Sequence, residues 1–410
     1  MMKRLTPASS EFWASTCILV VLLAMTLVPT SAYRFHPRDD TSAKKLFRTL
    51  QKKGLNKAAA AQQTAGYYEG LLDGAVGIAG VGGGGGRGWF DWRFWFAERA
   101  TLQVAETAVK RDLPGYLRYD LPPNINVPDL DERRRIVTNS MGMADKEYPV
   151  ESPVKTWRIG LIGDSVSQGI GTEFGNTFEA RLEDHLNKEY AGRGYERYEI
   201  LNFSVRGYQI THFVEVGLHR VPPFSPDAYV VALTVRSVYR SWADHLASLV
   251  RNRVDLKYDF LREIVRESGV GPNMTEALIN ARLAPYRIRV LHWALAELQA
   301  QARRDGVPLV VLLVPIADDT ELQLEEFSGV KPVLADLSIP TIDLLETFAY
   351  LDDLAPVRVS DGNRHPNDNG HKMLFDAILS KLRQDERLMA AFTGAPPRAA
   401  PPPPQSATGQ

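Results

Sequence analysis

The chain has 410 residues, of which 44% are hydrophobic and 24% are charged, and its formal net charge is −1. This composition is typical of a globular protein with an apolar core, and the length allows one large domain or two smaller ones. Because the net charge is close to zero and the basic residues are scattered along the chain, we expect no nucleic-acid partner.

The first 32 residues have the pattern of an export signal. Lys3 and Arg4 precede the apolar run "CILVVLLAMTLV", and small residues lead to a predicted cleavage point after Ala32. The run is shorter than the roughly 20 residues that a membrane-spanning helix needs. We expect an exported protein, periplasmic or secreted, with residues 1–32 either removed as a signal peptide or kept as a signal anchor that tethers it to the inner membrane. The one cysteine, Cys17, lies in this segment, so the mature chain has no disulfide and no cysteine nucleophile.

Residues 33–150 are predicted to form an N-terminal extension. It contains a glycine-rich linker (76–88) whose five consecutive glycines favour a flexible connection. A phosphate-binding loop would need a Lys-Ser/Thr ending, which this run lacks. An aromatic segment follows, and on a helix its tryptophans would share one face for packing on the main domain or a membrane surface, or for stacking on sugar rings: Trp89, Trp92 and Trp95.

From Trp157 onward, short apolar segments alternate with helical patterns. Strands are expected at 157–163, 198–204, 227–235, 307–315 and 339–344, and helices at 176–190, 287–306 and 366–384, with a polar helical insertion over roughly 240–275. Asn176 and Glu179 are predicted to cap the first helix, and Gly306 to end the second. The alternation predicts an α/β fold over residues 151–390: a doubly wound, flavodoxin-like parallel sheet of about five strands with helices on both faces. The proline-rich tail, 391–410, is predicted to be disordered.

The stretch "IGLIGDSVSQGIG" (159–171) places Ser165 just past the end of the first strand, where ligands of such sheets bind. Gly163 permits a sharp turn, and the backbone N–H groups that follow favour developing negative charge. A serine hydroxyl needs a base to become a good nucleophile, and the best candidate is His365, after the fifth strand. Asp361 is close enough in the chain to orient the imidazole. The sequence therefore predicts a Ser-His-Asp site, with ordinary polar surface residues as the alternative.

These segments resemble the SGNH (GDSL-like) hydrolases. The letters "GDSV" match the family's nucleophile block, and "RHPNDNGH" resembles its last block, which implies Ser165 as the nucleophile and His365 as the base. The segment "LNFSVRGY" resembles the second block, which implies an oxyanion hole formed by the N–H groups of Gly207 and Ser165. The resemblance covers roughly 135–385, and "TNSMGMADKE" looks like the lead-in of secreted bacterial members.

The chain departs from the family pattern at two positions. After the third strand it has "LTVRSVYRSW", with no asparagine to serve as an oxyanion donor, so Arg236 or Ser237 is the candidate substitute. The family's aspartate stands three residues before the histidine, which here is Gly362, and Asp361 is one residue further away. The hypothesis that Asp361 serves the histidine predicts that Asp361→Asn lowers turnover strongly, whereas a Ser-His pair without an acid is the alternative.

Together these features predict an exported serine esterase, an acyl hydrolase acting on O-acyl esters of a small molecule or a polysaccharide. A polysaccharide O-acyltransferase and a catalytically silent glycan-binding protein are the alternatives. We expect no cofactor and no metal, because the eight histidines are scattered without the paired spacing of a zinc helix. Asp368 is expected to cap the last helix and His371 to support its start. The oligomeric state stays open.

Overall fold

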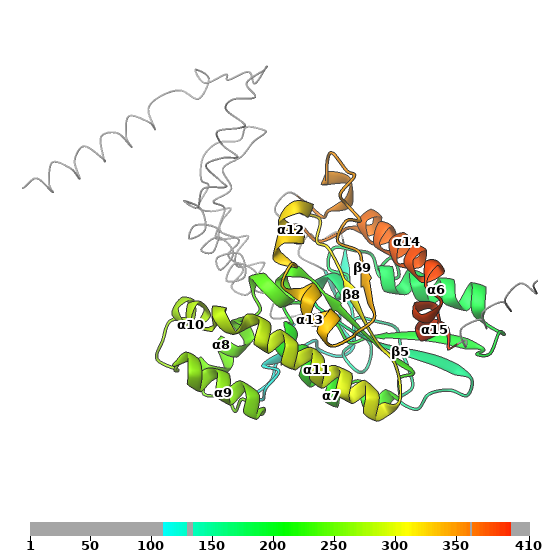
Figure 1. Cartoon of the computed structure of the whole chain (residues 1–410). Helices are drawn as coiled ribbons and strands as arrows, with labels where there is room; N and C mark the ends of the chain where they lie inside the picture. Colours follow the sequence, from blue (N-terminus) through cyan, green and yellow to red (C-terminus); the bar gives the residue numbers. More distant parts are fainter. Residues whose placement is uncertain (1–109, 129–133, 361–362, 395–410) are drawn as a thin grey trace, which may run out of the picture. The chain divides into compact units, whose positions relative to one another are not determined.

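The computed structural model describes residues 110–128, 134–360 and 363–394 (Figure 1). The predicted signal segment, the glycine-rich linker and the aromatic segment lie outside these residues, as does the chain from 395 onward. Within the described part of the chain, no helix is both long enough and apolar enough to cross a membrane.

Five parallel strands form the central sheet, in the order β6-β5-β7-β8-β9. Their bounds are β5 (Thr156–Ile162), β6 (Arg197–Asn202), β7 (Ala228–Leu233), β8 (Leu309–Leu313) and β9 (Thr341–Asp343). The first strand of the sheet lies between the second and the third, which is the doubly wound order that the sequence predicts. Both faces of the sheet are covered, so β7 and β8 are buried at every residue, and this burial explains their unbroken apolar sequence.

Helices cover the two faces of the sheet. On one face, α6 (Phe178–Tyr190) packs against α14 (Asp368–Gln384), and on the other α7 (Ile210–His219) packs against α11 (Arg287–Asp305) (Figure 1). The predicted insertion contains α8 (Asp244–Arg251) and α9 (Asp259–Ser268), and α10 (Glu276–Leu283) follows directly after it. Five further helices besides α7 were not anticipated from the sequence: α5 (Ser165–Gln168), α10, α12 (Thr320–Glu326), α13 (Val330–Asp336) and α15 (Glu386–Thr393).

Capping residues explain where the long helices begin and end. Gly306 ends α11 in the left-handed conformation, with φ 71°, as predicted. The predicted cap of α6 was wrong: Thr177, and not Asn176, is the N-cap, and its hydroxyl accepts the amide three residues later. The predicted cap of α14 was also wrong, because Asn367 is the N-cap and Asp368 lies in the first turn. In each pair two good capping residues are neighbours, so the choice between them depends on the backbone geometry.

Part of the predicted N-terminal extension belongs to the same core as the sheet. Residues 110–137 contain two short antiparallel pairs, β1 (Arg111–Asp112) with β2 (Tyr119–Asp120) and β3 (Asn126–Pro128) with β4 (Arg135–Val137). The buried side chains that residues 110–150 add to the main hydrophobic core are Tyr116, Leu121, Met143 and Tyr148.

A buried ion pair joins the end of this segment to the sheet. The Arg158 guanidinium, on β5, lies 2.7 Å from the Glu199 carboxylate on β6. It also donates hydrogen bonds to the carbonyls of Pro149 and Val150, at 2.8 and 2.9 Å. A buried charge is tolerated when it is paired and its donors are satisfied, and Arg158 meets both conditions.

Candidate active site

Ser165 is the first residue of a short helix, and two residues separate this helix from the end of β5. The helix is α5 (Ser165–Gln168), and its N-cap is Asp164, whose carboxylate accepts the amide of the residue after the serine at 3.1 Å. Gly163 is needed at the turn, because a Cβ there would lie 2.6 Å from the hydroxyl oxygen of Ser167. As the first residue of the helix, Ser165 has an amide without an acceptor inside the helix. Strand, glycine and cap together thus present the Ser165 hydroxyl and a free amide at the end of the sheet.

The structure brings Ser165 and His365 together, although they are 200 positions apart in the chain. The distance from His365 Nε2 to Ser165 Oγ is 2.7 Å, and both residues are buried. On the other side of the ring, His365 Nδ1 lies 2.6 Å from the side-chain oxygen of Asn363. An amide oxygen can only accept, so this contact places the ring proton on Nδ1 and leaves the lone pair of Nε2 facing the serine hydroxyl. This arrangement allows the imidazole to take the serine proton.

The residue that holds the imidazole in the described part of the chain is therefore an amide. The predicted acid, Asp361, lies outside the described residues. Asn363 was not anticipated from the sequence, because the third member of a Ser-His-Asp triad is a carboxylate. The available signal was its position: an Asn two residues before the histidine, within a short turn, can reach back to the histidine's own ring and amide, and both contacts occur.

The electrostatic surroundings keep the imidazole neutral. Burial lowers the pKa of His365 well below its ordinary value, and the nearby positive charges of Arg236 and Arg206 lower it further. The imidazole is therefore unprotonated at neutral pH and is ready to act as a base. Next to the nucleophile, burial raises the pKa of the Asp164 carboxyl to about 6.

Gly207 has a backbone conformation and a position that exclude a side chain. Its φ is +77°, and a Cβ would lie 2.7 Å from the hydroxyl oxygen of Tyr119. That hydroxyl donates a 3.1 Å hydrogen bond to the carbonyl of Arg206, which holds the turn in place. In the described part of the chain, the amide of Gly207 has no hydrogen-bond acceptor. It is available to bind an oxyanion, as the sequence resemblance implies.

The segment after β7 distinguishes the two candidate substitutes for the missing asparagine. The Thr234 hydroxyl donates to the Asp164 carboxylate, and a π-helical turn, η3 (Arg236–Arg240), follows. The Ser237 hydroxyl is already engaged, because it donates to the Thr234 carbonyl and accepts the Thr234 amide, each at 3.1 Å. Arg236 is buried and its charge acts on His365. Since the Ser237 hydroxyl is engaged by Thr234, Arg236 is the remaining candidate.

His371 has a structural contact and lies outside the Ser-His pair. It was expected to support the start of its own helix, but its Nδ1 accepts the amide of Phe178 at 3.1 Å and so supports the start of α6. Burial lowers its pKa to about 3, so it is neutral. Among the described residues, no group of three or more His, Cys, Asp or Glu side chains is placed to hold a metal ion.

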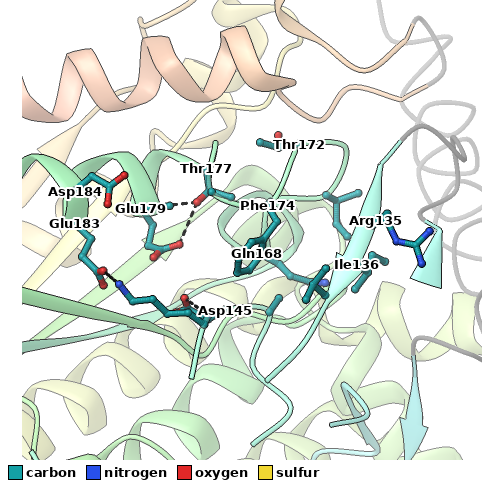
Figure 2. A pocket seen from close by; sticks show the side chains of 17 residues that line it. Arg135, Ile136, Asp145, Gln168, Thr172, Phe174, Thr177, Glu179, Glu183 and Asp184 are labelled. Carbon is teal, nitrogen blue, oxygen red and sulfur yellow. Dashed lines mark hydrogen bonds and ion pairs between the residues drawn. The ribbon is translucent and has the colours of Figure 1, made fainter. Parts of the chain in front are cut away.

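A separate pocket of about 150 Å³ lies between the end of α5 and the start of α6 (Figure 2). It is lined by acidic side chains, among them Asp145, Glu179 and Glu183, and by Gln168 at the end of α5, whereas Ser165 and His365 do not line it. Burial raises the pKa of Asp145 to about 7 and that of Glu179 well above its ordinary value. This pocket is therefore distinct from the nucleophile.

Comparison with known proteins places this geometry in a family. The model of the GDSL-like lipase/acylhydrolase family matches residues 159–378. A search of the curated proteins found no match.

Among solved structures, the chain is similar to three enzymes. An alpha/beta hydrolase from the metagenome of Lake Arreo, Spain, is 17% identical, with 55% of this chain and 94% of that chain covered and a TM-score of 0.38. An acetylxylan esterase of Geobacillus stearothermophilus is 14% identical, with 55% and 93% covered and a TM-score of 0.37. A two-domain esterase active on acetylated mannans is 10% identical, with 60% and 52% covered and a TM-score of 0.38. Since the matched residues 159–378 span more than half of the chain and carry the Ser-His pair, the chain belongs to the GDSL-like lipase/acylhydrolase family of ester-hydrolysing serine hydrolases.

Proposed function

We propose that this protein hydrolyses acyl esters, with Ser165 as the nucleophile and His365 as the base. The observation that carries the proposal is the 2.7 Å contact between His365 Nε2 and Ser165 Oγ, with the opposite ring nitrogen held by Asn363. Nε2 takes the hydroxyl proton as Oγ attacks the carbonyl carbon, and it returns that proton to the departing alcohol. The acyl-enzyme is then attacked by water, with His365 again as the base.

The charge that develops on the carbonyl oxygen needs donors in fixed positions. The amides of Ser165 and Gly207 supply two of them, and Arg236, in the segment after β7 where the family resemblance implies an asparagine, is the candidate for a third. Removal of one such donor typically lowers kcat by about 10²- to 10³-fold. Asn363 is a positioning residue in this scheme, because it acts on the substrate only through His365.

The proposal is tested with purified protein and 4-nitrophenyl acetate. We expect turnover by the parent, loss of turnover in Ser165→Ala and His365→Gln, and labelling of Ser165 by a fluorophosphonate, located by peptide mass spectrometry. Ser328→Ala, which changes an exposed serine, is the matched control and keeps full activity. Absence of both turnover and labelling in the folded parent would refute the proposed chemistry.

We also propose that the protein is exported and acts on an O-acyl ester of a carbohydrate or a small molecule. The proposal of export is supported by the sequence of residues 1–32, which has a basic start and a short apolar run. Fractionation of cells that express the full chain and a form lacking 1–32 tests export, and recovery of both forms in the cytosol contradicts it.

Product analysis with acetylated and free sugars distinguishes transfer to water from transfer to a sugar. Glycan binding without turnover would indicate the catalytically silent glycan-binding protein.

A further inference from the structure

Arg206 has a buried guanidinium group that the protein leaves without a partner. The residue is 7% exposed, and none of its three guanidinium nitrogens has a hydrogen-bond acceptor among the described residues. Its backbone, in contrast, is held on both sides: the amide donates to the side-chain oxygen of Gln168 at 2.5 Å, and the carbonyl accepts the Tyr119 hydroxyl at 3.1 Å. The fold therefore fixes the position of Arg206 without satisfying its charge.

Two other arginines of this fold that have little exposure are paired with carboxylates. Arg158 pairs with Glu199 and donates to backbone carbonyls. Arg240, which is also largely buried, pairs with both Glu326 and Asp318. A buried charge without a counter-charge is strongly unfavourable, so a guanidinium in this condition indicates that its anion comes from outside the chain.

The location of Arg206 connects this unsatisfied charge to the Ser-His pair. It directly precedes Gly207, and its backbone amide donates to the side chain of Gln168 on α5, the helix that begins at Ser165. Its charge and that of Arg236 both lower the pKa of His365. The charge of Arg236 also lowers the pKa of the Asp164 carboxyl, so Arg236 has an acidic neighbour. In the described part of the chain, no carboxylate lies within ion-pair distance of Arg206.

We propose that Arg206 binds a carboxylate of the substrate, next to the ester that Ser165 attacks. The inference rests on the proposed esterase function and narrows its substrate class to esters that carry a negative charge. A guanidinium presents parallel N–H donors that match the two oxygens of a carboxylate. A site with such a buried donor also discriminates against a neutral analogue, which would leave the charge unpaired.

The carboxylate belongs either to the acyl part or to the alcohol part of the ester, and two pairs of substrates distinguish these sources. For the acyl part, 4-nitrophenyl hydrogen adipate is compared with 4-nitrophenyl methyl adipate, which has the same chain and leaving group. For the alcohol part, 4-acetoxybenzoate is compared with methyl 4-acetoxybenzoate. The readout is the ratio of kcat/KM for the anionic ester to that for the neutral ester, because a general loss of activity cancels in this ratio.

We expect Arg206→Met to lower this ratio by about 10- to 100-fold in one of the two pairs, which then identifies the part that carries the charge. Arg206→Lys keeps the charge without the paired donors and gives an intermediate ratio. Arg193→Met, which changes an exposed arginine lying over the Tyr190 ring, leaves both ratios unchanged. The proposal is overturned if folded Arg206→Met has the same ratio of anionic to neutral kcat/KM as the parent in both pairs. It is also overturned if the parent has a higher kcat/KM for the neutral ester in both pairs.

A binding measurement separates this inference from the esterase proposal. In Ser165→Ala, we expect adipate or 4-hydroxybenzoate, the product anions of the two charged esters, to raise the thermal unfolding midpoint in a concentration-dependent way. The rise is lost in the double variant Ser165→Ala with Arg206→Met. Anion binding without any esterase activity would contradict the proposed reaction and support the anion site. Activity on neutral esters without anion binding would support the reaction and contradict the anion site.

Discussion

The hydrogen bond between Asn363 and His365 makes a prediction with a definite size. The imidazolium that forms during attack donates from Nδ1 to the Asn363 oxygen, at 2.6 Å in the free protein. A hydrogen bond to a charged group contributes about 1.5–3 kcal/mol, which corresponds to about 10- to 150-fold in rate. We therefore expect Asn363→Ala to lower kcat/KM for 4-nitrophenyl acetate by about that factor, with its circular dichroism spectrum unchanged.

Two further variants test the reasoning. Asn363→Asp places a carboxylate at Nδ1, so it should keep activity at pH 8 and move the acidic limb of the pH profile to higher pH, because a negative charge raises the pKa of His365. Asp361→Asn is the direct comparison, since the sequence-based hypothesis predicts a strong loss and the Asn363 contact predicts a change within a few-fold. A strong loss in Asp361→Asn together with a near-normal Asn363→Ala would refute the assignment of Asn363.

Three other predictions follow from the same site and its surroundings. Because burial and nearby cations lower the pKa of His365 below its ordinary 6.5, kcat/KM should stay constant from pH 8 down to pH 6.5 and decline only at lower pH. If the midpoint of this decline lies above pH 6.5, the prediction is wrong. Gly207→Ala should lower kcat/KM by about 10²- to 10³-fold, since its Cβ would lie 2.7 Å from the Tyr119 hydroxyl oxygen. The control is Gly192→Ala, which should leave kcat/KM unchanged, because Gly192 also has a positive φ, +83°, but a Cβ there has no atom within 4 Å. Glu179 has a pKa raised by burial, so the folded state favours its protonated form and loses stability as pH rises. The free energy of unfolding, measured in urea, should therefore fall less between pH 5 and pH 8 in Glu179→Gln than in the parent. An equal decrease in the two proteins would contradict a raised pKa of Glu179.

The strands and the Ser-His pair could be predicted because their signals are local. A strand buried on both faces, such as β7, reads as an unbroken apolar run. Glycine directly after such a run marks the turn at which a side chain projects from the end of the sheet. Ser165 therefore stood out without any knowledge of its partners. His365 was identified from a different signal, its place between the last predicted strand and the last helix.

The remaining site features depend on packing that local patterns do not contain. An amide that replaces a carboxylate beside His365 cannot be distinguished from an ordinary turn residue until the ring and Asn363 are placed together. Arg206 is recognised only by the missing partner of its guanidinium, which is a property of the folded interior. The choice between Asn176 and Thr177 as a helix cap depends in the same way on one pair of dihedral angles.

The packing of residues 110–150 on the sheet sets a limit on how the chain can be shortened. A fragment that starts at 151 would deprive the Arg158 guanidinium of two acceptors and take four side chains out of the main core. Loss of acceptors for a buried charge is severely destabilising. A fragment that starts at residue 110 is therefore expected to unfold at a higher temperature than one that starts at residue 151.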